Sequence, residues 1–161
     1  MTAETMSDCL ICQGRDGDAA LCRIEVWEDA LWRVTISVES EVPGFAYLEP
    51  KRHVPHITDL SGQEAATFGS VLARTTAALR DAANADLVYV YVFGGGIPHL
   101  HVHLAPHREG DALNTQIIRG ELEEVPLPSG ATMYYSKEFP PLPEEHLRDV
   151  AERVRETLAS A

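Results

Sequence analysis

A chain of 161 residues has the length of one ordinary domain, and its 45% hydrophobic and 24% charged residues exclude a disordered or fibrous protein. A formal net charge of -12 disfavours nucleic acid as a partner, because a polyanion would be repelled. The longest apolar run, Leu87 to Phe93, is far shorter than the roughly 20 residues that span a bilayer, and the N-terminus lacks a basic and apolar leader. We therefore expect one compact domain over residues 1–161, located in the cytoplasm and binding no membrane.

The three cysteines do not form the even-numbered pattern of a secreted disulfide framework. The two-residue spacing in Cys9-Leu-Ile-Cys12 lets one turn present two thiolates to a metal, although a lone pair is only half of a tetrahedral site. Unligated thiols or a redox pair are the alternatives that the spacing leaves open. Cys22 begins a strand pattern and is expected to be a small core residue.

Three short runs rich in branched and aromatic residues follow, at 22–27, 31–38 and 44–48. Breaks at Glu28-Asp29 and Pro43-Gly44 separate them, so they predict a meander of antiparallel strands. Aromatic side chains in strands are more often core than pocket wall, and we expect this of Trp27, Trp32, Phe45 and Tyr47.

The rest of the chain predicts two helices and a hairpin. Ser61-Gly-Gln-Glu64 is a capping-box pattern, and the apolar residues after it have helical spacing, which predicts a helix over 61–82. Strands over 87–93 and 99–104, joined by a glycine turn, predict a hairpin. Residues 108–142 are polar and rich in proline, and residues 143–154 predict a C-terminal helix with acidic residues in its first turn.

A run of alternating histidines forms the second strand of that hairpin. Because a strand has a period of two residues, His99, His101 and His103 are expected to project from one face while the aliphatic residues between them pack on the other. Three imidazoles facing a core would each need a hydrogen-bond partner, so we favour a functional site. A metal-binding or half-exposed cluster is the alternative.

Three glycines precede this strand. Gly94, Gly95 and Gly96 leave the backbone without side-chain cover, so an oxyanion can approach the N–H groups closely. Together with the neighbouring imidazoles, they indicate phosphate chemistry.

The run His99-Leu-His-Val-His-Leu-Ala matches the signature of the histidine triad family, His-φ-His-φ-His-φ-φ, where φ is hydrophobic. The chain resembles the nucleotide hydrolase and transferase branch of that family. Glu49-Pro-Lys-Arg-His-Val and Val26-Trp-Glu-Asp are weaker matches to other family segments. The resemblance, which covers residues 9–108, implies an α+β fold with a central antiparallel sheet, a long helix after the third strand and a C-terminal helix, and usually a homodimer that joins two sheets.

The resemblance also implies catalytic roles for the three histidines. The middle one, His101, is expected to attack the α-phosphorus of a nucleotide and to form a nucleotidyl-histidine that water or another acceptor resolves. An imidazole that is neutral near pH 7 can act in this way if its other nitrogen donates a proton to a fixed acceptor. His99 and His103 are expected to stabilise the charge that develops on the phosphoryl oxygens.

Positive charge near the triad is expected to help bind the substrate. Lys51 and Arg52 lie in the segment that resembles the family's Pro-Lys-x-His stretch, and Arg108 lies closest in sequence to the triad strand. The predicted substrate-binding residues are Gly94, Gly95, Gly96, Arg108 and Lys51.

A structural zinc site is a further implication of the resemblance. Bacterial triad proteins with a similar Cys-x-x-Cys complete the site with the histidine of the Pro-Lys-x-His stretch and the first histidine of the triad. The metal ligands expected here are therefore Cys9, Cys12, His53 and His99.

The chain departs from the family pattern at the substrate-contacting positions. Ser37 lies where the family normally has an aspartate that holds the ribose hydroxyls. Phe93-Gly-Gly-Gly-Ile-Pro replaces a segment in which the family has amide and hydroxyl donors. Losing these groups removes orientation rather than nucleophilicity, so the substrate or the acceptor is expected to differ.

The expected function is that of a hydrolase or nucleotidyl transferase acting through nucleotidyl-His101 on a nucleoside phosphate derivative, such as a dinucleoside polyphosphate or a nucleoside phosphoramidate. One alternative is a non-catalytic protein that binds a nucleotide or a metal, which the altered glycine loop favours. A second alternative is a specialised metabolic enzyme that uses the triad on a non-nucleotide substrate, which Ser37 favours.

Overall fold

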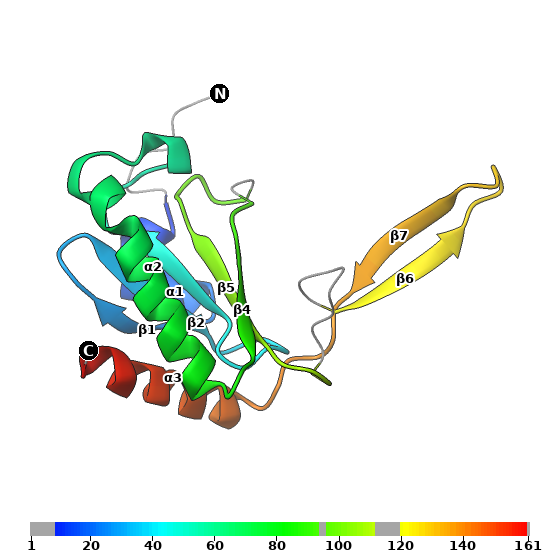
Figure 1. The fold of residues 1–161 in the computed structure, drawn as a ribbon. Helices are drawn as coiled ribbons and strands as arrows, with labels where there is room; N and C mark the ends of the chain where they lie inside the picture. The colour runs from blue at the N-terminus through cyan, green and yellow to red at the C-terminus, as the bar shows by residue number, and fades with distance from the viewer. Residues whose placement is uncertain (1–8, 94–95, 112–119, 161) are drawn as a thin grey trace.

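A five-stranded antiparallel sheet lies at the centre of the computed structural model, which describes residues 9–93, 96–111 and 120–160 (Figure 1). The strand order is β1-β2-β3-β5-β4, so the first three strands form the expected meander and β5 pairs with both β3 and β4. The predicted α+β class with a central antiparallel sheet is therefore confirmed. The elements of this part are η1 (Ile11–Gln13), α1 (Arg15–Ala20), β1 (Arg23–Glu28), β2 (Trp32–Ser37), β3 (Ala46–Pro50), η2 (Ile57–Asp59), α2 (Gly62–Ala82), β4 (Leu87–Tyr91), β5 (Val102–His107) and α3 (Glu144–Ala159).

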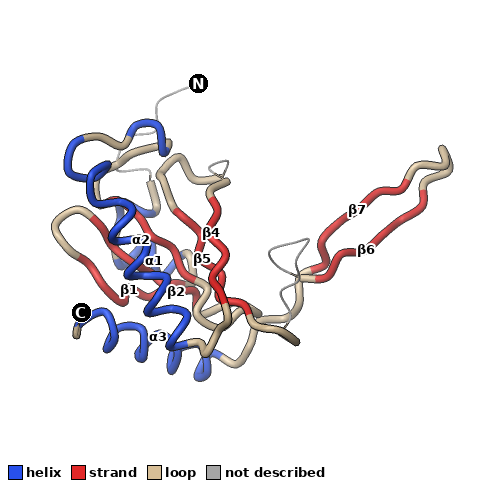
Figure 2. Tube along the Cα trace, in the orientation of Figure 1, coloured by secondary structure: helices blue, strands red, loops and turns tan. Residues whose placement is uncertain are grey.

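Helices α2 and α3 pack together and cover one face of the sheet (Figure 2). Val34 of β2, Leu79 of α2 and Val154 of α3 are fully buried between these layers. Both predicted helices are confirmed, and the C-terminal one continues to Ala159 instead of ending at Val154. None of the helices in the described residues is long and apolar enough to cross a membrane.

The capping box predicted at the start of α2 does not form. Ser61 has the extended backbone of an N-cap but makes no side-chain hydrogen bond to the helix. Glu64, the other half of the pattern, instead accepts hydrogen bonds from the Arg52 guanidinium at 2.5 to 3.2 Å. The carboxylate is more strongly satisfied by a cation than by a backbone N–H, so the ion pair prevails.

The face of the sheet opposite α2 and α3 carries the chemistry, and we call it the histidine face. Leu48 and Val102 face the helices, so their strand neighbours Tyr47 and His103, which are directly paired, lie on the histidine face. Arg33 and Glu49, another direct pair, lie on the same face by the same alternation. Strand periodicity thus gathers charged and aromatic side chains beside the imidazole of His103.

Strand β5 begins at Val102, three residues later than the predicted strand over 99–104. Leu100 donates its backbone N–H to the carbonyl of Val54 at 2.6 Å, so the chain before Val102 is bonded outside the sheet ladder. Cys22 also differs from prediction: it is half-buried, has a φ of 51° and lies just before β1 rather than in the core. The sequence pattern continues past the true strand ends in both cases.

A second sheet of two strands, β6 (Glu121–Pro126) and β7 (Thr132–Lys137), lies inside the polar and proline-rich stretch 108–142, for which the sequence pattern predicts no strand. This hairpin projects away from the five-stranded sheet (Figure 1). Three of the six residues of β6 are glutamates, which have low β propensity, so no local signal marks the strand. That residues 1–161 form one domain stays a prediction.

Candidate active site and metal cluster

Four side chains from separate parts of the chain form a compact cluster of thiols and imidazoles. Cys9 and Cys12 come from the N-terminal segment around η1, while His53 follows β3 and His99 precedes β5. The Nδ1 atom of His99 lies 3.5 Å from the Cys9 Sγ and 3.3 Å from the Cys12 Sγ, and the His53 Nδ1 lies 3.4 Å from the Cys12 Sγ. All four donor atoms lie within 4.8 Å of one another, so this cluster could bind a metal ion.

The protonation states of the histidine and cysteine side chains in the cluster suit metal binding. His99 donates its Nε2–H to the carbonyl of Pro50 at 2.8 Å, so in the neutral ring the lone pair of Nδ1 faces the two thiols. Burial lowers the pKa of His99 to about 4, which keeps the ring neutral at pH 7, as ligation requires. Burial and the neighbouring Cys9 raise the pKa of Cys12 to about 11, so a thiolate there needs a compensating cation.

The fit of two thiols and two imidazoles to zinc can be tested on distances alone. Zinc bonds of about 2.3 Å to sulfur and about 2.0 Å to nitrogen place tetrahedral S and N ligands about 3.5 Å apart. The three separations of 3.3 to 3.5 Å are close to this edge length. The cluster therefore needs little rearrangement to hold a tetrahedral ion.

Gly17 of α1 fits against the loop that carries the cysteines, and we expect Gly17→Ala to disturb it. An added Cβ would lie 1.8 Å from the carbonyl oxygen of Leu10, which lies between Cys9 and Cys12. We expect a loss of about 1 to 3 kcal/mol in the free energy of unfolding, measured in urea, and faster loss of metal to a competing chelator.

Gly69→Ala is the matched control for this variant. Gly69 is exposed on α2, and its added Cβ would meet nothing within 4 Å. Alanine lowers the conformational entropy of the unfolded chain, which is expected to stabilise the protein by about 0.5 to 1 kcal/mol. Equal stability of the two variants would contradict the close fit of α1 on the cysteine loop.

His101 and His103 form a pair on the histidine face, with ring centroids 5.0 Å apart. His101 donates its Nδ1–H to the carbonyl of His99 at 2.6 Å, so in the neutral ring Nε2 carries the lone pair. Burial lowers the pKa of His101 from its ordinary value, which favours that neutral form. The ring therefore has the tautomer that a nucleophilic imidazole needs.

His99 does not join this pair, which differs from the expected row of three imidazoles. Both of its ring nitrogens are engaged, one facing the thiols and one bonded to Pro50, and its ring packs on His53 at 5.3 Å. His99 lies three residues before β5, and Leu100 after it is bonded to Val54 outside the sheet ladder, so the alternation of the strand does not extend back to His99. The structure brings together His101 and His103 as one site and His99 with the metal cluster as another.

Aromatic rings surround His103. Its ring centroid lies 4.8 Å from that of Tyr91, 5.2 Å from Tyr47, 5.7 Å from Phe93 and 6.1 Å from Phe45. Phe93 is 70% exposed, so these rings form one edge of a surface site rather than a closed core. The expectation that the strand aromatics are core therefore fits Phe45, which is buried, better than Tyr47, which is half-buried beside the imidazoles.

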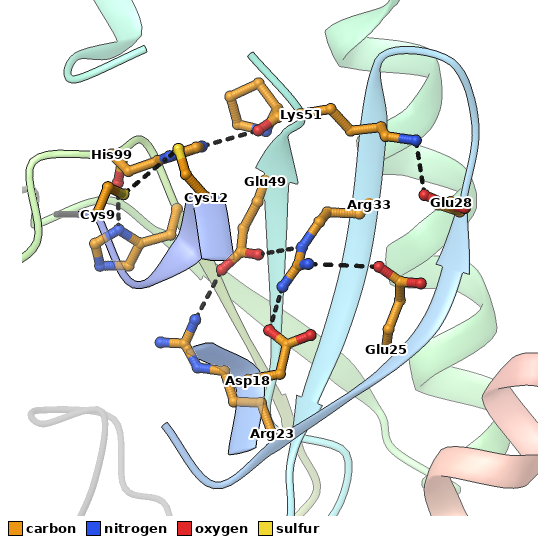
Figure 3. Close-up of polar contacts among 12 residues, drawn as sticks. Cys9, Cys12, Asp18, Arg23, Glu25, Glu28, Arg33, Glu49, Lys51 and His99 are labelled. Atoms are coloured by element: carbon orange, nitrogen blue, oxygen red, sulfur yellow. Dashed lines mark hydrogen bonds and ion pairs between the residues drawn. The ribbon is translucent and has the colours of Figure 1, made fainter. Parts of the chain in front are cut away.

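A buried cluster of charges around Arg23, Arg33 and Glu49 lies on the histidine face (Figure 3). Glu49, which is fully buried, accepts from the Arg23 Nη1 at 2.7 Å and from the Arg33 Nε at 2.9 Å. Arg33 also pairs with Asp18 of α1 and, at 3.5 Å, with Glu25. Burial pushes the pKa of the Glu49 carboxyl upward and the two guanidinium groups oppose that shift.

The sequence interpretation missed this cluster, although its signal is present. Strand alternation places Arg23, Arg33 and Glu49 on the face opposite the aliphatic core residues. A charged residue on this same face in each of three neighbouring strands is the pattern that would have revealed the cluster.

The predicted substrate-binding cations lie apart from the imidazole pair. The Lys51 Nζ binds the Glu28 carboxylate at 2.7 Å at the turn between β1 and β2 (Figure 3). Arg108 follows β5 at its far end, seven residues beyond His101 and hence about 20 Å away along the strand. Its backbone N–H donates to Asp111 there. No hydrogen bond or ion pair within the described residues joins either cation to His101, and their roles in substrate binding stay predictions.

The predicted backbone and hydroxyl contacts are partly outside the described residues. Gly94 and Gly95 fall there, and Gly96 is exposed with nothing within 4 Å of an added Cβ. Ser37, at the position of the missing aspartate, both donates to the carbonyl and accepts from the N–H of Glu39. Its hydroxyl is therefore occupied within its own turn.

A comparison with protein-family models and a comparison with known proteins agree with each other. The model of the HIT domain matches residues 23–110, which is more than half of the chain. The nitrilase and fragile histidine triad fusion protein NitFhit of Caenorhabditis elegans is 30% identical over 89 residues, 52% of this chain but only 20% of that protein. The bis(5'-adenosyl)-triphosphatase of Dictyostelium discoideum is 25% identical over 94 residues, 55% of this chain and 63% of that protein.

Solved structures show the same fold. The Zn-bound histidine triad family protein from Mycobacterium smegmatis matches with a TM-score of 0.65 and 21% identity, over 98% of this chain and 100% of that one. The expected fold, with its long helix after the third strand and its C-terminal helix, is thereby confirmed.

Proposed function

Because this chain belongs to the HIT domain family, we propose that it is a hydrolase or nucleotidyl transferase acting on a nucleoside phosphate derivative through His101. The observation that carries the proposal is the hydrogen bond from the His101 Nδ1–H to the His99 carbonyl. It fixes the tautomer whose Nε2 lone pair can attack phosphorus. The name of the Dictyostelium relative, a bis(5'-adenosyl)-triphosphatase, supports a nucleoside polyphosphate as the substrate class.

The proposed reaction has two steps at His101. The Nε2 lone pair attacks phosphorus, a P–N bond forms, and the bond to the leaving group breaks with its electron pair on that group. Water then attacks phosphorus, a P–O bond forms, the P–N bond breaks with its electron pair returning to Nε2, and the proton lost by water passes to the solvent. His103, 5.0 Å away between ring centroids, is placed to stabilise charge on the phosphoryl oxygens in both steps. For a transferase, another acceptor replaces the water.

We assign the cluster of Cys9, Cys12, His53 and His99 to a structural zinc ion. Two thiolates and two imidazoles are a donor set that zinc commonly takes in closed sites. The related protein from Mycobacterium smegmatis is described as Zn-bound, which agrees with the assignment. A bound ion would hold the N-terminal segment against the residues that precede β5.

Trapping of the intermediate tests the proposed function. The protein is mixed with diadenosine polyphosphates and with adenosine phosphoramidate, quenched, and analysed by intact mass spectrometry and by acid lability. We expect a mass increase of one adenylate group on the wild-type chain during turnover. Absence of both turnover and adduct with every substrate would contradict an enzymatic role and leave the non-catalytic binding protein as the answer.

A second candidate, a phosphate substrate that lacks a ribose, is favoured by Ser37. Its hydroxyl is occupied by the backbone of Glu39, so no carboxylate is offered to ribose hydroxyls at this position. Turnover of a simple phosphoramidate or phosphodiester at a rate equal to that of its adenosine counterpart would select this candidate.

We propose that the protein is a homodimer joined at β4. Among the described strands, β4 is an edge of the five-stranded sheet, and it and the two residues after it expose apolar side chains. Leu87, Val90, Val92 and Phe93 are 38 to 70% exposed. Such an edge is a template for pairing with another sheet.

Val90→Lys is expected to convert this dimer to a monomer. A buried ammonium at the interface lacks a partner, so the dissociation constant of the dimer should rise about 100-fold, as measured by sedimentation equilibrium. Met133→Lys on the projecting β7 is the control and should stay dimeric. The reverse result would place the interface on the β6–β7 hairpin instead.

A further inference from the structure

Arg23 lies on β1, an edge strand of the sheet, yet its side chain is buried. Its side chain is 93% buried, since 7% of it is exposed, and its guanidinium lies 3.4 Å above the centroid of the Tyr47 ring. Nη1 binds Glu49, but Nε is buried and has no hydrogen-bond partner among the described residues. A buried N–H without a partner is costly, so it needs an explanation.

The same Tyr47 ring links Arg23 to both imidazoles. The Tyr47 centroid lies 5.2 Å from that of His103 and 6.4 Å from that of His101. Arg23 also acts on His101 as a positive charge through space. The guanidinium is thus a cation held beside the pair, whereas Lys51 and Arg108 lie elsewhere.

We propose that Arg23 is the anion-binding residue of this site, holding nonbridging oxygens of the phosphoryl group that His101 attacks. The stacking on Tyr47 and the bond to Glu49 fix the guanidinium plane, which leaves donors in a rigid fork for oxygens. The ligand class is a nucleoside phosphate derivative, and adenosine monophosphate and inorganic phosphate present the same nonbridging oxygens. The inference rests on the proposed function in taking His101 as the residue that meets phosphorus.

Glu49 sets the strength of this anion site. Its single carboxylate is shared by Arg23 and Arg33, and it is fully buried. The carboxylate anchors Arg23 but also repels an incoming phosphate across a short distance. A glutamine at this position keeps an amide oxygen that can accept from Arg23 but carries no charge, so it preserves the anchor and removes the repulsion.

Equilibrium binding of adenosine monophosphate and of inorganic phosphate, by calorimetry, tests the inference. Arg23→Gln should weaken binding about 10- to 100-fold, the effect of a lost charge-assisted hydrogen bond, and Arg23→Lys should weaken it less. Glu49→Gln should tighten binding at least about threefold, because the repelling charge is gone. Arg80→Gln, an exposed cation on α2, should leave binding unchanged.

Weaker binding in Glu49→Gln, or unchanged binding in Arg23→Gln, would overturn the inference, as would the absence of any binding by the wild-type protein. Glu49→Gln decides the question even where Arg23→Gln fails to fold. The outcome is independent of the adduct experiment: an adduct on His101 without Arg23-dependent binding rejects only this inference. Arg23-dependent binding without an adduct rejects only the proposed reaction.

Discussion

Replacing His101 with glutamine is expected to reduce turnover of a diadenosine polyphosphate about a thousandfold or more and to abolish the covalent adduct. Loss of a nucleophile removes the whole two-step route, and only binding and electrostatic stabilisation remain. Glutamine is close to imidazole in size and is polar, so the buried donor that bonds to the His99 carbonyl can be retained. The measurement is single-turnover kinetics with intact mass analysis.

Variants of two other histidines provide comparisons for His101→Gln. His103→Asn should lower turnover by a factor of about 10 to 100 while still permitting an adduct, because it removes stabilisation of charge but not the attacking atom. His146 is exposed on α3 and serves as the surface control, with no change expected for His146→Gln. An adduct that persists in His101→Gln would move the nucleophile to another residue.

The sheet and the long helices were predictable because their signals are local. The apolar spacing after Ser61 describes the buried stripe of α2 correctly. Only the predicted capping contact was wrong, because Glu64 instead forms an ion pair with Arg52, which lies earlier in the sequence. The β6–β7 hairpin has no such stripe, because it does not pack on a core in the described part of the chain. Its strands could not be predicted from periodicity.

The candidate site was predictable to the extent that a short motif encodes it. The four residues implied as metal ligands do meet, although Cys9 and His99 are far apart in sequence. The orientation of His99 could not be read from alternation, because alternation describes residues only while they remain in the strand. Arg23 was overlooked because a single cation in a strand carries no local signal until its cross-strand neighbours are known.

Removal of one metal ligand is expected to be the most destabilising change outside the core. Cys12 lies within 3.4 Å of both histidine nitrogens of the cluster, so Cys12→Ser should abolish binding of a stoichiometric metal ion. The free energy of unfolding should fall by at least about 3 kcal/mol, because structural zinc supplies folding energy directly. Elemental analysis and urea unfolding measure the two effects.

Cys22→Ser is the matched control. Cys22 is a free cysteine outside the cluster, so its variant should keep the metal and its stability within about 0.5 kcal/mol of wild type. Equal metal content in the Cys12 and Cys22 variants would remove Cys12 from the site.

Loss of the metal is also expected to lower turnover, because the backbone of His99 connects the metal cluster to His101. His99 is held by its side chain in the cluster, and its carbonyl is the acceptor that orients His101. Without the metal, His99 keeps its hydrogen bond to Pro50 but loses the link to the N-terminal segment, so its carbonyl is held less firmly. Turnover in Cys12→Ser, measured on the folded fraction, should therefore fall about tenfold, whereas Cys22→Ser should match wild type. Full activity in metal-free protein would show that the strand alone positions His101.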